Sequence, residues 1–81
     1  MRFDIVAEAR AGLLCRLIGM IAQHDAIAPE VQVTVTAETM LARIDIQDVP
    51  DVACVVIAHK MARCIGVDSV TVDGVLLSLS G

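Results

Sequence analysis

Residues 8–14 read Glu-Ala-Arg-Ala-Gly-Leu-Leu, and across them an alternating segment gives way to a largely apolar one. Before this stretch, residues 2–8 alternate apolar and polar side chains with one exception, which is typical of a strand with one buried face. After it, residues 12–24 place apolar side chains every three or four positions, which is typical of an amphipathic helix. The stretch is therefore a strand-to-helix junction, around which the rest of the chain is arranged.

This junction offers no side chain that caps a helix, because residues 8–14 contain no Ser, Thr, Asp or Asn. A side-chain oxygen usually accepts one of the free N–H groups at a helix start. Without it, these donors remain available for water or for a small anion such as a ligand carboxylate. Gly12 is either a close-packing residue or a direct ligand contact. Arg10 either binds a carboxylate or is a solvated charge.

Three further segments predict strands. Residues 31–36 and 40–46 alternate apolar and polar side chains, and residues 67–72 form another β-rich run. Asp73-Gly74 is a two-residue hairpin signal. Residues 75–79 therefore either fold back as a short fifth strand or exchange onto a partner's sheet edge.

A second helix is predicted between the third and fourth strands. Asp48 is its expected N-cap, and Gly66 is placed to adopt the left-handed conformation that ends it. The core stripe expected on this helix consists of Cys54, Ile57, Met61, Cys64 and Ile65.

The element order is β-α-β-β-α-β, which predicts one α+β domain over residues 1–81 with a ferredoxin-like fold. Its antiparallel sheet carries both helices on one face, and its other face is predicted to be wetted. The residues expected on that open face are Asp4, Val6, Gln32, Thr34, Arg43, Asp45, Thr71 and Asp73.

Composition narrows the function classes. The chain has 81 residues and is 57% hydrophobic, above the ordinary range of about 45–50%, so some aliphatic side chains are expected between subunits in a homodimer or larger homo-oligomer. A net charge of −4 disfavours nucleic acid as a binding partner, because its phosphates are negative too. The longest apolar run, Val52–Ala58, is too short to span a membrane. No signal peptide is recognised, and three Cys in apolar segments suggest reduced thiols and a cytoplasmic location.

Some side chains suggest subunit contacts, whereas none suggests a metal or catalytic site. Val52 and Val56 fall on the outward side of the second helix, and Leu76 and Leu77 follow the hairpin; they are either interface or plain surface residues. Cys54, His59 and Cys64 are spaced five apart, which turns them away from a common ion. We therefore expect no metal, no cofactor and no enzymatic activity.

Two motifs resemble those of ACT domains. Arg10-Ala11-Gly12-Leu13-Leu14-Cys15-Arg16-Leu17 resembles the family's opening, in which a strand is followed by a pattern like Asp-x-Pro-Gly-Leu-Leu and a helix. Ile65-Gly66-Val67-Asp68-Ser69-Val70 resembles the closing Gly-Val-x-x-Val. The resemblance covers residues 2–73 and is nearest to the short regulatory subunit of acetolactate synthase.

The resemblance implies a domain that binds an amino-acid-like carboxylate, pairs with a second copy into a continuous sheet and modulates an enzyme of amino-acid biosynthesis. It places the ligand at Arg10, Ala11, Gly12 and Leu13, near the subunit interface. Ala11 stands where the family commonly has Pro, the family's acidic residue at the loop entrance is replaced by Ala9, and the chain lacks Asn. These departures leave a second hypothesis open: a ligand-free assembly subunit of a larger enzyme.

Overall fold

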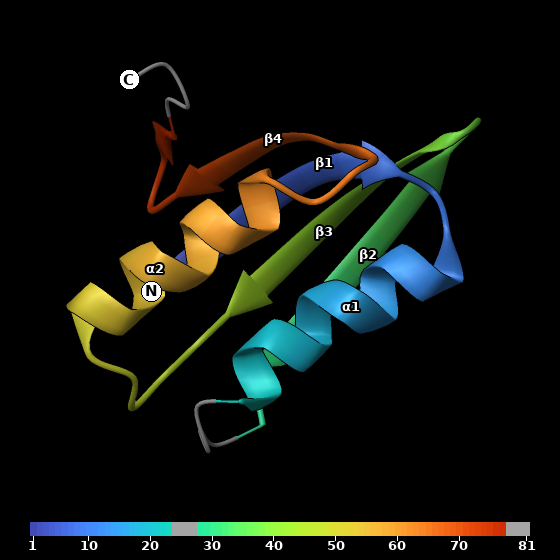
Figure 1. Ribbon diagram of the computed structural model, residues 1–81. Coiled ribbons are helices and arrows are strands. Elements are labelled where there is room, and N and C mark those ends of the chain that lie inside the picture. Colours follow the sequence, from blue (N-terminus) through green and yellow to red (C-terminus); the bar gives the residue numbers. More distant parts are fainter. Residues whose placement is uncertain (24–27, 78–81) are drawn as a thin grey trace.

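The computed structural model describes residues 1–23 and 28–77. Both helices lie on one face of an antiparallel sheet (Figure 1), as the sequence predicted. The strand order across the sheet is β2-β3-β1-β4-β5. The elements, in chain order, are β1 (Arg2–Glu8), α1 (Ala11–Ala22), β2 (Glu30–Thr36), β3 (Thr39–Asp45), α2 (Asp51–Ala62), β4 (Val67–Val72) and β5 (Val75–Leu76).

Alternation along β1 and β3 sets the register of the sheet. Phe3 pairs with Ile44, and Ile5 pairs with Ala42, so the apolar members of both strands face the helices together. The core fills the single layer between helices and sheet, and its described members include no buried polar or charged residue. Its side chains are Phe3, Ile5, Ala7, Leu13, Leu17, Ile21, Met40, Ala42, Ile44, Ile46, Cys54, Ile57, Ala58, Met61 and Val70.

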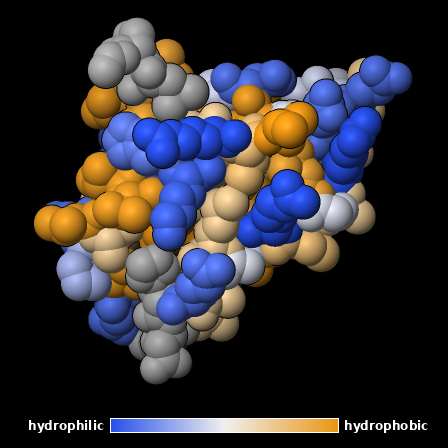
Figure 2. Space-filling model, in the orientation of Figure 1, coloured by the Kyte–Doolittle hydropathy of each residue, from blue (hydrophilic) through white to orange (hydrophobic). Residues whose placement is uncertain are grey.

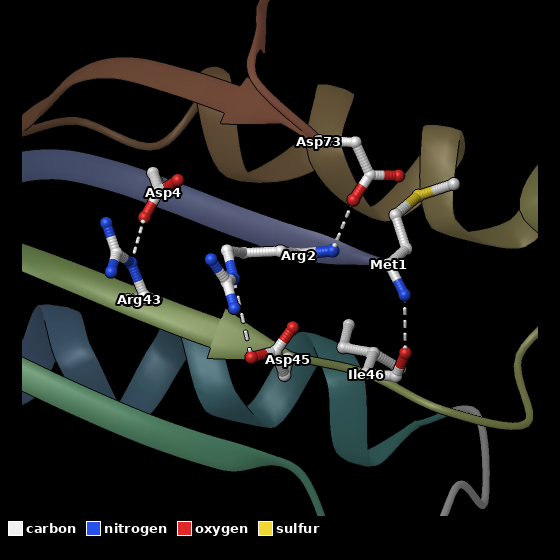
Figure 3. Close-up of polar contacts among 7 residues, drawn as sticks. All are labelled: Met1, Arg2, Asp4, Arg43, Asp45, Ile46 and Asp73. Atoms are coloured by element: carbon white, nitrogen blue, oxygen red, sulfur yellow. Dashed lines mark hydrogen bonds and ion pairs between the residues drawn. The ribbon is translucent and has the colours of Figure 1, made fainter.

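The open face of the sheet is polar, as predicted, and ion pairs cross its central strands (Figure 3). Arg43 Nε donates to Asp4 Oδ1 at 2.8 Å, and this hydrogen bond raises the pKa of the Arg43 guanidinium. Arg2 Nε lies 3.5 Å from Asp45 Oδ2, while the Arg2 backbone N–H donates to Asp73 Oδ1 at 2.8 Å. Asp4 and Asp45 are therefore each paired with an arginine, whereas Asp73 accepts from a backbone N–H.

The hairpin signal at Asp73-Gly74 is confirmed. Both residues have positive φ, 48° and 83°, which is what a two-residue hairpin of the primed type requires. β5 pairs with β4 of the same chain, with Thr71 opposite Leu76. The part of the expected fifth strand beyond Leu77 falls outside the described residues, as do His24 and Asp25, where the first helix was expected to end.

Two expectations about α2 are wrong. Asp48 does not cap the helix: α2 begins after Pro50, with no side-chain cap, while Asp48 has a φ of 61°. Ile65 is not in the core but 93% exposed, because the helix ends at Ala62 and the following turn directs Ile65 outward.

Neither helix in the described ranges has the length and apolar character that crossing a bilayer needs.

The edge strand β2 is less covered than its pattern suggested. Val31, Val33 and Val35 lie on the helix side of the sheet, opposite Ile44, Ala42 and Met40 of β3. All seven residues of β2 are nevertheless exposed, and Val35 reaches 60%. The two helices cover the central strands and leave this apolar edge only partly covered.

Gly66 is required by both its conformation and its neighbours. Its φ is +96°, and a Cβ there would lie 3.1 Å from Leu13 Cδ2 and 3.3 Å from Glu8 Oε2. We predict that Gly66→Ala lowers the free energy of unfolding by about 1–3 kcal/mol, from left-handed strain and crowding. Gly19→Ala is the matched control, since a Cβ there meets nothing within 4 Å and should stabilise α1 by about 0.5–1 kcal/mol. Urea unfolding measures both; equal effects would contradict the assignment.

The three cysteines should differ in reactivity. Cys15 is exposed and Cys64 is half-buried, whereas Cys54 is 1% exposed and burial raises the pKa of its thiol. Because the thiolate is the nucleophile, we expect iodoacetamide to modify Cys15 first and Cys54 only after unfolding. Peptide mapping by mass spectrometry with and without urea gives the order, and rapid native labelling of Cys54 would contradict the packing described.

Candidate functional site

Three backbone hydrogen bonds fix the junction between β1 and α1. Glu8 N–H donates to the Gly66 carbonyl at 2.8 Å, and Ala9 N–H donates to the Glu38 carbonyl at 2.9 Å. Arg10 N–H donates to the Glu8 carbonyl at 2.9 Å. The junction is thereby attached to the loop before β4 on one side and to the β2–β3 turn on the other.

Immediately after these bonds the backbone donors are free. Arg10 is the N-cap, with extended backbone (φ −127°, ψ 129°) and no side-chain cap, and the first turn of α1 contains no acidic residue. Leu14 N–H makes the first helical bond, to the Arg10 carbonyl at 3.0 Å. Within the described residues, the N–H groups of Ala11, Gly12 and Leu13 have no hydrogen-bond partner, as the uncapped sequence predicted.

A shallow hollow adjoins this helix start. Arg10, Gly12 and Leu13 line it together with Arg16 and Ile65. Three of the four residues expected from the sequence are thus brought together, while Ala11 is exposed beside them. The hollow combines an apolar wall, two guanidinium groups and the positive end of α1. Such a set suits a ligand that carries a carboxylate and an aliphatic group.

Sequence reasoning missed two of these residues. Arg16 was not among the residues expected at the site, although its spacing of four from Gly12 places both on one helical face. No ion pair of the described residues involves Arg16, so its charge is available. Ile65 was assigned to the core, and only the early end of α2 reveals it as an exposed apolar side chain.

The Arg10 side chain already has an acidic neighbour. Its Nε lies 3.3 Å from Glu8 Oε2, and both side chains are more than half exposed. Exposed pairs of this kind contribute about 0–1 kcal/mol, so a ligand carboxylate competes against a weak contact. On the other side of Arg10, a second hollow carries the carboxylates of Glu8, Glu38 and Asp68.

The residues expected at a subunit contact lie on two elements. Val52 and Val56 on α2 are 78% and 45% exposed, and Leu76 on β5 is 65% exposed. Leu77 differs, because it is partly buried and packs against the core of its own chain. Val55, which the sequence did not single out, is 46% exposed on the same helix.

Titratable side chains do not assemble into a metal-binding cluster anywhere in residues 1–23 and 28–77. On the open face, Asp4 and Asp45 are separated by the arginines that pair with them. Cys54 and Cys64 donate weakly to carbonyls of their own segment, at 3.7 and 3.6 Å.

Comparison with known proteins agrees with this fold. The crystal structure of the ACT domain from GTP pyrophosphokinase of Chlorobium tepidum superposes with a TM-score of 0.72, over 85% of this chain and 90% of that one, at 17% sequence identity. This likeness shows the fold. No curated protein matches the chain significantly. A family model described as ACT-like domain matches residues 1–78, and the chain therefore belongs to the ACT-like domain family.

Proposed function

We propose that this ACT-like regulatory domain senses a small amino-acid-like carboxylate at the start of α1 and transmits its binding through contacts with a second copy. The observation that carries the proposal is the set of unpartnered N–H groups at Ala11, Gly12 and Leu13 beside two arginines. Oriented amides at a helix start stabilise an anion by hydrogen bonding and by the helix dipole together.

The lining of the hollow suggests which carboxylates it prefers. Ile65 and the largely buried Leu13 line the hollow next to the donors, and Ile65 is 93% exposed. An aliphatic amino acid would cover this side chain while its carboxylate meets the amides. Acidic ligands with a second carboxylate would approach Glu8 at a cost, because like charges repel.

The partner copy is proposed to pair along β2. This edge strand is seven residues long and contains no Lys or Pro, the residues that usually protect an edge from pairing. In an antiparallel pair centred on Val33, Val31 faces the partner's Val35, so the valines of both copies form one continuous apolar row. Glu30 then faces the partner's Thr36, which avoids opposing charges of like sign.

The junction offers a physical connection between the ligand and this edge. The hydrogen bond from Ala9 N–H to the Glu38 carbonyl joins the β1–α1 loop to the turn that closes β2 and β3. A ligand that shifts the loop acts on this turn, where Ala37 holds a φ of 54°. Differential affinity of the ligand for two arrangements of the pair would then regulate an attached or associated enzyme.

The Glu8–Arg10 pair favours a second candidate function. The Glu8 carboxylate pairs with Arg10, one of the two arginines at the site, so this arginine has a partner even when no ligand is bound. An assembly subunit that binds no small molecule would have such an internal partner. Pairing along β2 is common to both candidates. Ligand titration distinguishes them.

Substitution of Arg16 tests the sensing proposal. We predict that isothermal titration with a panel of amino acids detects binding, strongest for aliphatic ones, and that Arg16→Gln weakens it about tenfold, since a charged hydrogen bond of about 1.5 kcal/mol is lost. Arg43→Gln removes the same charge from the open face and should bind as the wild type does. Absence of heat and of any thermal shift with every amino acid would leave the assembly function.

Substitution of Val33 tests the proposed pairing edge. A lysine on the helix side of an edge strand opposes sheet extension, so Val33→Lys should abolish association along β2 and halve the mass of the assembly in sedimentation velocity. Thr34→Lys is the matched control, because the same charge on the open face stays in water. Unchanged association of Val33→Lys would refute pairing along β2.

A further inference from the structure

The proposed function leaves the outer face of α2 unused. Val52, Val55 and Val56 are exposed there at 78%, 46% and 45%, while Cys54, Ile57, Ala58 and Met61 fill the core on the opposite side. The outer side of α2 is therefore apolar in its first half and polar in its second, where His59, Lys60 and Arg63 lie. Figure 2 shows hydrophobic surface next to hydrophilic surface where Figure 1 places α2. A helix with one buried face normally turns polar residues to water.

The charged residues of α2 are separated by sign along the helix. Asp48 and Asp51 lie at its beginning, whereas Lys60 and Arg63 lie at its end, and all four are exposed. None of the ion pairs among the described residues uses them. The charges agree with the dipole of α2, but the dipole does not account for valines between them.

We propose that the outer face of α2 is a second self-association surface, on which α2 of another copy docks antiparallel. In that orientation Val56 of one copy lies near Val56 of the other, and the aliphatic stem of Lys60 covers the partner's Val52. The acidic beginning of each helix meets the basic end of the other. Parallel docking would instead bring like charges together, so the charge pattern selects the antiparallel arrangement.

This contact is geometrically compatible with pairing along β2. Sheet extension relates two copies by a two-fold axis perpendicular to the sheet and leaves all four helices on one side. Docking of α2 on α2 uses a two-fold axis parallel to the sheet. Two perpendicular two-fold axes that intersect close into a four-copy assembly. That assembly has its helices inside and its sheets outside, and it would bury the excess of aliphatic surface.

Two sets of variants test the surface by sedimentation in the full chain. The wild type should reach a tetramer, and Val52→Ser with Val56→Ser should stop at a dimer, because both positions are exposed and tolerate the change in the fold. Val33→Lys should also stop at a dimer, held by α2 alone, and all three changes together should give a monomer. If the serine variant assembles as the wild type does, the α2 surface is overturned while pairing along β2 stands.

A charge reversal separates docking from the helix dipole. Asp51→Lys and Arg63→Glu each place like charges at the contact and should raise the dimer–tetramer dissociation constant at least fivefold. The double variant restores opposite charges between copies, so its constant should return toward the wild-type value, although it opposes the dipole at both helix ends. A double variant as weak as the weaker single one would overturn the proposal; circular dichroism checks that each variant folds.

Discussion

The hydrogen bonds that hold the β1–α1 junction are the constraint on which the rest of the structure depends. Glu8 N–H and Ala9 N–H are used by the Gly66 and Glu38 carbonyls, so the chain leaves β1 in a fixed direction. Because these bonds end at Arg10 and no side chain caps the helix, the next three donors face outward. The same geometry that closes the fold therefore leaves the candidate site open.

Gly66 links this constraint to the second half of the chain. Its left-handed backbone ends the turn after α2, and the absence of a Cβ lets Leu13 and the Glu8 side chain approach. β4 then enters beside β1, with a register shift next to Ala7. The strand that carries the junction, β1, is thus central in the sheet. The elements around it bring Arg10, Arg16 and Ile65 together at the start of α1.

Much of the fold was predictable from local patterns. The alternation in residues 2–8 gave β1 its bounds because one-sided burial leaves a period of two, and Asp73-Gly74 predicted its hairpin because both positions need positive φ. The exposure of β2 was not predictable, because its apolar and polar residues alternate as they do in a strand with one buried face. Whether Val31 and Val33 are buried depends on where α1 lies. The predicted cap at Asp48 and the predicted core position of Ile65 were wrong for a related reason. Helix ends depend on backbone geometry that side-chain periodicity does not encode. At the site, the free amides followed from missing caps, whereas Arg16 and Ile65 needed the three-dimensional arrangement.

The proposed sensing function requires that the amides at the start of α1 receive a ligand carboxylate. The most direct measurement is a titration of the ¹⁵N-labelled chain with an aliphatic amino acid, followed by the amide resonances of Ala11, Gly12 and Leu13. Carboxylate binding there should shift these signals together and saturably, downfield as hydrogen bonds form, while the amide signals of β5 stay in place. Saturable shifts confined to another region, or none at ligand concentrations in the millimolar range, would contradict it.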